Sequence, residues 1–236
     1  VDADIDKFRI KQIDHKKLLP VLRELEFKSL VSEFENLTGA EPLPVIESKP
    51  AEEIKVKNAK ELARALQTAK DKGALAVLAV TEDTGDLFEE NRKMCFVTGN
   101  KQYYSFPVSE EYMKVFGNTA EDPNIIIIGH DIKKLMLVLK KQGIELKGKL
   151  FDTLIASSLL NADSPANEIK DVASRYLGID IGADGCVSCL PAAYGEMQKR
   201  LKDAGLYGLF EDIEMPLPVD QLREILQEVL DSENLN

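Results

Sequence analysis

The chain has 236 residues, 44% of them hydrophobic and 30% charged, which is typical of a water-soluble globular protein. No apolar run approaches the roughly 18 residues that a membrane helix needs, so we expect no membrane partner. The net charge of −11 argues against strong autonomous DNA binding, which usually requires a basic surface. The acidic, mixed start at Val1 is no secretory signal and favours a cytoplasmic fragment of a longer protein.

The three cysteines, Cys95, Cys186 and Cys189, are odd in number and lack framework spacing, as expected in a reducing compartment. Cys186 and Cys189 form a CxxC pair, but zinc would need two more ligands. The histidines, His15 and His130, lie far from this pair in the sequence. We therefore expect these cysteines to have no joint role.

Periodicity and proline content divide the chain into four segments. Residues 1–37 are expected to form a small helical extension. Residues 38–52 contain three prolines and no apolar period, so they are expected to be a linker. A compact domain follows over 53–215, and 216–236 is expected to be a last amphipathic helix.

Within 53–215, apolar runs of strand length and alternating segments predict strands, and a helical period bounded by caps and glycines predicts helices. Strands are expected at 74–82, 92–100, 101–108, 124–130 and 150–153, with a hairpin turn at Gly99-Asn100. Helices are expected at 58–73, 109–117, 131–143, 153–162, 167–178, from about 191, and 206–216. This order predicts an α/β fold in which helices flank a mixed sheet.

Four segments stand in a characteristic order: LAVLAVTED (75–83), GHDIKKLMLVLKKQGIELKGKLFDTLIASSLLN (129–161), DVASRYLGIDI (171–181) and FEDIEMPL (210–217). Together they resemble the 3′–5′ proofreading exonuclease domain of bacterial DNA polymerase I, which has a ribonuclease H-like fold. In that family FEDIEMPL marks the passage to the polymerase domain, and residues 8–30 resemble the end of the 5′-nuclease region. The resemblance implies as partners the polymerase and 5′-nuclease domains of the same parent chain, and DNA through that parent.

Active members of the family hold two divalent metal ions with four carboxylates, and hard cations such as Mg²⁺ require these oxygen ligands. The first motif, Asp-x-Glu, is matched by Val80-Thr81-Glu82, so its Asp is missing. The second motif places an Asp where this chain has Leu135, with Asp131 at the preceding Asn-like position. The third, Tyr-x-x-x-Asp, falls near Gly185, where GADGCVSCL does not contain it.

Other polar residues near these motifs have a structural interpretation beside a catalytic one. Glu82, Asp83 and Asp86 either form half of a metal site or lie in a solvated acidic turn, and we favour the turn. Asp131 and Asp152 each precede a predicted helix, so we expect capping rather than metal binding. We expect His130 to be a structural residue rather than a general base. Tyr176 and Asp180 have the third motif's spacing, but the resemblance implies that this tyrosine packs at a helix end.

A basic run and an aromatic run raise the question of DNA contact. Lysines at 133, 134 and 140, with those at 141, 147 and 149, are either a remnant DNA track or one solvated face, and we favour the solvated face. Lys133, Lys134 and Lys140 are the candidates for DNA contact. Tyr103, Tyr104 and Phe106 could stack on bases, but alternating aromatics in a hairpin more often fill a core.

The sequence favours a catalytically degenerate exonuclease-like domain without catalytic residues, metal ligands or a cofactor. The domain would then be a structural module of a replication and repair polymerase. One alternative is an active exonuclease that holds Mg²⁺ or Mn²⁺ with rearranged ligands, drawn from Glu82, Asp83, Asp131 and Asp184. A second alternative is a non-enzymatic module that binds single-stranded DNA or a replication protein.

Overall fold

The computed structural model describes residues 18, 21, 22, 30, 46, 47, 51–82, 91–97, 102–181 and 187–216. The chain divides into two compact units, Val1–Val45 and Ile46–Asn236. In the expected N-terminal extension the four described residues are helical, and Leu22 is buried. The rest of that extension, nearly all of the linker and the helix expected after Pro216 lie outside the described residues.

A six-stranded mixed sheet forms the centre of the second unit, in the order β2-β5-β4-β3-β6-β7. The pairs β5–β4 and β4–β3 are antiparallel, and β2–β5, β3–β6 and β6–β7 are parallel. A separate parallel pair joins β1 (Ile46–Glu47) to β8 (Ile179–Asp180). The predicted α/β class with a mixed sheet is thus confirmed. The strands of the large sheet are β2 (Glu52–Lys55), β3 (Ala74–Glu82), β4 (Asn91–Val97), β5 (Gln102–Pro107), β6 (Ile126–Gly129) and β7 (Leu150–Asp152).

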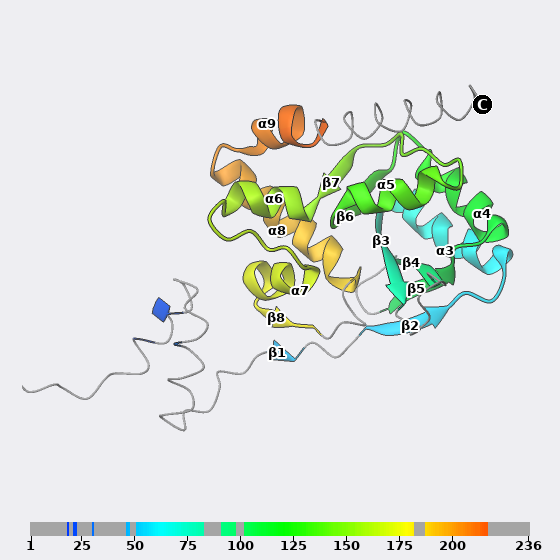
Figure 1. Cartoon of the computed structure of the whole chain (residues 1–236), viewed down its shortest axis with the longest axis horizontal. Coiled ribbons are helices and arrows are strands. Elements are labelled where there is room, and N and C mark those ends of the chain that lie inside the picture. The colour runs from blue at the N-terminus through cyan, green and yellow to red at the C-terminus, as the bar shows by residue number, and fades with distance from the viewer. Residues whose placement is uncertain are drawn as a thin grey trace, which may run out of the picture. The chain divides into compact units, whose positions relative to one another are not determined.

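Helices flank the sheet, and Figure 1 shows α3 and α4 gathered at one end of the unit and α6, α7 and α8 at the other. Helix α3 packs against α4, and α6 packs against α8. The predicted helix at 167–178 is a short α-helix that continues as a π-helical turn. The segment that begins at Tyr207 has the same arrangement, a short α-helix followed by a π-helical turn. The bounds are α3 (Ala59–Lys72), α4 (Glu110–Ala120), α5 (Ile132–Lys140), α6 (Thr153–Leu160), α7 (Ile169–Val172), η2 (Ala173–Leu177), α8 (Leu190–Asp203), α9 (Tyr207–Leu209) and η4 (Phe210–Glu214).

The first long helix, α3, begins and ends where the sequence predicts. The Asn58 side chain accepts a hydrogen bond from the Glu61 amide at 2.9 Å, as an N-cap should. The Glu61 carboxylate accepts from the Lys57 amide at 3.0 Å, one residue before the partner of a standard capping box. Gly73 ends the helix with φ 67°, a conformation that costs glycine little.

Aromatic side chains join the hairpin strands to α4. The Phe106 ring lies 6.0 Å from Phe96 and 5.7 Å from Phe116, between ring centroids, and all three are almost fully buried. Tyr103 is also buried, and Tyr104 stacks on Phe96 at 5.2 Å. The prediction that these aromatics fill a core is confirmed.

Among the described residues, no helix combines the length and apolar character that crossing a membrane would require.

Gly148, in the loop that leads to β7, lies close against the backbone of a neighbouring segment. A Cβ atom there would lie 1.9 Å from the Ile125 carbonyl oxygen, so any side chain must displace backbone. We expect Gly148→Ala to destabilise the protein by about 1–3 kcal/mol or more, measured as the free energy of unfolding in urea. Gly195 is the matched control, because it is exposed within α8 with nothing within 4 Å. Gly195→Ala should stabilise by about 0.5–1 kcal/mol, and equal effects of the two changes would contradict the packing.

Candidate functional site

The candidate site lies at the edge of the sheet where β3, β6 and β7 end. These three strands are parallel, so their carboxyl ends point the same way, and the register places Gly129 beside Asp152. Such edges are where α/β folds gather functional side chains. Val80 lies near the end of β3, and Leu135 lies on the first turns of α5, just after β6.

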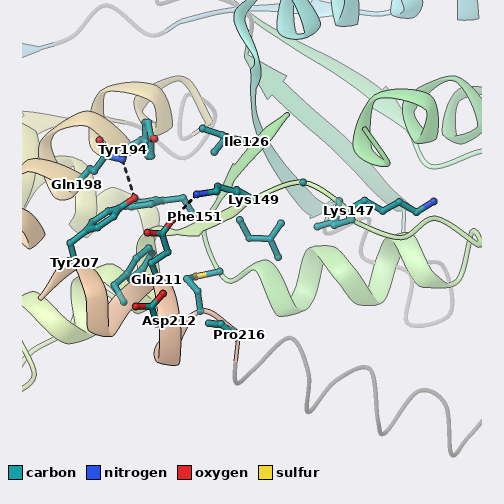
Figure 2. A pocket seen from close by; sticks show the side chains of 15 residues that line it. Ile126, Lys147, Lys149, Phe151, Tyr194, Gln198, Tyr207, Glu211, Asp212 and Pro216 are labelled. Atoms are coloured by element: carbon teal, nitrogen blue, oxygen red, sulfur yellow. Dashed lines mark hydrogen bonds and ion pairs between the residues drawn. The ribbon is translucent and has the colours of Figure 1, made fainter. Parts of the chain in front are cut away.

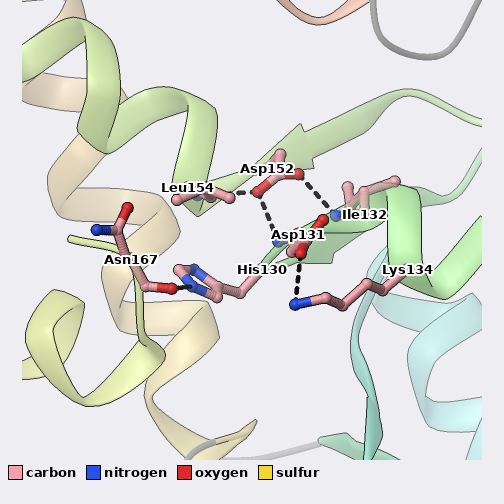
Figure 3. A network of polar contacts seen from close by, with 7 residues as sticks. All are labelled: His130, Asp131, Ile132, Lys134, Asp152, Leu154 and Asn167. Atoms are coloured by element: carbon pink, nitrogen blue, oxygen red, sulfur yellow. Dashed lines mark hydrogen bonds and ion pairs between the residues drawn. The ribbon is translucent and has the colours of Figure 1, made fainter. Parts of the chain in front are cut away.

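Asp152 is the polar centre of this edge. Its side chain is 2% exposed, and its carboxylate accepts three backbone hydrogen bonds (Figure 3). Oδ1 accepts from Asp131 at 3.0 Å and from Leu154 at 2.8 Å, and Oδ2 accepts from Ile132 at 2.7 Å. One carboxylate therefore caps α6, as predicted, and also satisfies amides at the start of α5. Burial raises the pKa of the Asp152 carboxyl above its ordinary value, and the three donated hydrogen bonds oppose that rise.

Asp131 does not cap α5 with its side chain, so that part of its prediction is wrong. It occupies the N-cap position, but with φ 55° and ψ 62°, in the left-handed region, and its side chain makes no capping hydrogen bond. Its carboxylate pairs with Lys134 at 2.8 Å, which raises the pKa of that lysine. Asp152 instead accepts the hydrogen bonds of the Asp131 and Ile132 amides, because the left-handed turn directs these amides toward β7.

His130 has the structural role that was predicted for it. Nδ1 lies 2.9 Å from Thr153 Oγ1, and Nε2 lies 2.9 Å from the Asn167 carbonyl oxygen. Since that carbonyl can only accept, Nε2 carries a proton. The Thr153 hydroxyl oxygen also lies 3.1 Å from the Gly129 carbonyl oxygen. Both ring nitrogens are thus engaged, and the histidine joins β6 to α6 and to the loop before α7.

Val80 and Leu135 both belong to the hydrophobic interior. Leu135 is 3% exposed, and half-buried Val80 packs against the core cluster that contains it. Strand β3 ends at Glu82, whose side chain is outside the described residues, as are Asp83, Asp86, Asp184 and Gly185. Over the residues that are described, no three His, Cys, Asp or Glu side chains gather as metal ligands would. The side chains of Val80 and Leu135 contain no oxygen atoms, so these two positions do not fit a divalent cation.

Tyr176 packs as the resemblance implied. It is buried, and its hydroxyl donates to Ser157 Oγ at 3.2 Å, while that oxygen accepts from the Ala166 amide at 2.7 Å. The Arg200 guanidinium lies over its ring, 5.3 Å from the centroid. The hydroxyl is thus fixed inside the α6–α8 layer.

The sheet face that bears Val80 carries a polar cluster that the sequence did not reveal. Lys93 Nζ lies 3.4 Å from Glu53 Oε1, and these side chains are 25% and 26% exposed. The hydrogen bond from Ser105 and the charges of Lys93 and Lys55 lower the pKa of Glu53. The position of Lys93 on this face could have been predicted by aligning the alternating residues of β4 with those of β3.

The predicted lysine run lies on the surface. Lys133, Lys134 and Lys140 are exposed on α5, and Lys149 pairs with Glu211 at 2.9 Å, which raises the pKa of Lys149.

Beside the Lys149–Glu211 pair, a pocket of about 830 Å³ opens at the amino ends of β6 and β7 (Figure 2). Asp152 lies at the opposite, carboxyl end of β7. The walls of the pocket include Phe151, Tyr194, Gln198, Tyr207, Asp212 and Pro216.

Several solved structures have a similar fold at low sequence identity. Solved structures with this fold include the POL domain of Pol1 from M. smegmatis in complex with DNA primer-template and dNTP (TM-score 0.61, 17% identity, 72% of this chain, 31% of that one). They also include NrnC from Brucella melitensis bound to pGG (0.56, 16%, 75% and 93%). A third is the catalytic core of RRP6 from Trypanosoma brucei (0.56, 14%, 73% and 53%).

Residues 86–188 match the family model described as DNA polymerase I, ribonuclease H-like domain. DNA polymerase I of Bacillus subtilis is 23% identical over 205 residues, which is 85% of this chain. The chain is thus similar, over these residues, to the ribonuclease H-like domain of DNA polymerase I, which is the resemblance that its sequence motifs indicated. It spans 21% of the length of that relative.

We expect Asp152→Asn to reduce stability by about 1–3 kcal/mol, because an amide NH₂ would replace one buried acceptor that faces backbone donors. The measurement is the free energy of unfolding at pH 7. Asp131→Asn is the matched control, because it makes the same chemical change at the same edge. It removes only a partly exposed ion pair, and asparagine tolerates the left-handed region. Similar losses in the two variants would contradict the role given to Asp152.

Proposed function

We propose that this chain is a catalytically degenerate 3′–5′ exonuclease-like domain and a structural module of a DNA polymerase I. The family match and the fold support the kind of domain. The observation that carries the loss of catalysis is Leu135, which is almost wholly buried where active relatives place a metal-binding carboxylate.

The chemistry of the edge supports this proposal. Phosphodiester hydrolysis in this family uses two cations that stabilise the attacking and leaving oxygens, and hard cations need oxygen ligands. Without metal, clustered buried carboxylates would repel one another and lose their hydration. Apolar side chains at Val80 and Leu135 remove that cost and contribute burial instead. The edge is then stabilised by packing and by the Asp152 hydrogen bonds.

The purified chain should therefore not degrade single-stranded DNA from the 3′ end in Mg²⁺ or Mn²⁺. The measurement is a gel assay with 5′-labelled oligonucleotide, with an exonuclease that keeps all four carboxylates as the positive control. A 3′–5′ ladder that Glu82→Ala abolishes would refute the proposal and favour the active alternative with rearranged ligands.

A second candidate function, DNA binding without hydrolysis, is favoured by the surface of α5. This helix carries three exposed lysines and no acidic residue, although the chain as a whole is acidic. Lysines of this kind would contact phosphates and read no sequence. Their affinity for DNA would fall as salt rises.

For this candidate we expect Lys133→Gln with Lys140→Gln to weaken a gel shift on single-stranded DNA at least severalfold at low salt. Lys60→Gln with Lys114→Gln is the control, since it removes the same charge from exposed positions on α3 and α4. If both pairs weaken binding equally, or if salt has no effect, α5 is not a DNA-binding surface.

A further inference from the structure

The pocket beside the Lys149–Glu211 pair has an apolar lining that is incompletely covered. Ile126, Leu150 and Tyr207 line it and are only half-buried, so each leaves apolar surface open to the pocket (Figure 2). Apolar surface gathered in a hollow is a common mark of an interaction site. This hollow is therefore a candidate for binding a further part of the protein.

The short helical segment that forms one wall of the pocket exposes more apolar surface. Leu209, in α9, is 37% exposed, and Ile213, in η4, is 54% exposed. The residues between them, 210–212, line the pocket. This segment thus carries more apolar surface than the described residues cover.

The chain itself continues from the wall of this pocket. Pro216, the last described residue, lines it, so residues 217–236 start there. An isolated amphipathic helix of this length is marginal in water and needs a surface on which to bury its apolar stripe. The sequence after Pro216 has such a stripe, with apolar residues spaced i, i+3, i+4, i+7 and i+8 at Leu222, Ile225, Leu226, Val229 and Leu230.

We infer that residues 221–230 bind as a helix in this pocket, with Leu222 and Leu226 against its apolar lining. The inference goes beyond the proposed function and does not depend on the loss of catalysis. Residues 217–220 span at most about 14 Å when fully extended, so the apolar stripe starts close to Pro216. So short a connection gives the stripe an effective concentration on the order of millimolar at the pocket. This proximity favours the chain's own segment over a partner from solution.

The test uses the absence of tryptophan from the chain. Tyr207→Trp places a single fluorescent reporter in the pocket wall, and quenching by acrylamide measures how exposed the reporter is. Leu226→Asp should release the segment, because burying an unpaired charge is strongly unfavourable, and raise the Stern–Volmer quenching constant about twofold or more. Gln227→Asp is the matched control, because it introduces the same side chain at the next position, on the polar side of the helix. It should leave the quenching constant unchanged.

No rise with Leu226→Asp, or an equal rise with Gln227→Asp, would overturn the inference. Quenching that falls as the protein concentration rises would also overturn it, because a second copy of the chain would then cover the pocket. Thermal unfolding, followed by circular dichroism, checks that the reporter variants keep the fold.

Hydrogen exchange in the native chain tests the same inference without any substitution. The backbone amides of residues 221–230 should exchange at least about tenfold more slowly than in an unfolded peptide, because docking stabilises the helix. Exchange at the rate of an unfolded peptide would overturn the inference, whatever the reporter variants show. Nuclease activity of the native chain would refute the proposed function and leave this interface unaffected.

Discussion

The buried carboxylate of Asp152 joins the two turns from which this edge of the sheet is built. It accepts hydrogen bonds from backbone amides at the start of α5 and at the start of α6, so it fixes where both helices leave the sheet. The left-handed backbone at Asp131 depends on this interaction, because the Asp131 side chain makes no capping hydrogen bond to the amides at the start of α5. His130 adds a second connection through Thr153 and the loop before α7. The edge is thus organised by side-chain hydrogen bonds to the backbone.

Local rules predicted much of this fold. Periodicity and caps located β3, the hairpin, α3 and α5, because those elements carry their signals within a few residues, as Asn58 and Gly73 do for α3. Strand β2 was missed because its four residues, EEIK, show no clear alternation and adjoin a proline-rich segment. The capping of α5 was assigned to the wrong aspartate, since Asp152 acts across 20 positions in sequence and only the folded sheet brings it near.

At the candidate site, residue-by-residue comparison with the family predicted which positions correspond to metal ligands, and the structure supplied the surroundings of those positions. The sequence placed Val80 and Leu135 where ligands are expected, and the fold buries Leu135 and packs Val80 against the core. The Lys93–Glu53 cluster could not be read from spacing alone, since it depends on how β4 aligns with β3 and on β2 lying beside β5. Apolar side chains at these two positions provide none of the oxygen ligands that a hard cation needs.

In the proposed degenerate domain, the end of β3 does not hold a pair of divalent cations. The most direct measurement is anomalous X-ray scattering from crystals of the native chain soaked in millimolar Mn²⁺. The account predicts no ordered manganese near Val80 and Leu135. Two manganese peaks about 3.5–4 Å apart at that edge, the spacing of a two-metal hydrolase site, would contradict it.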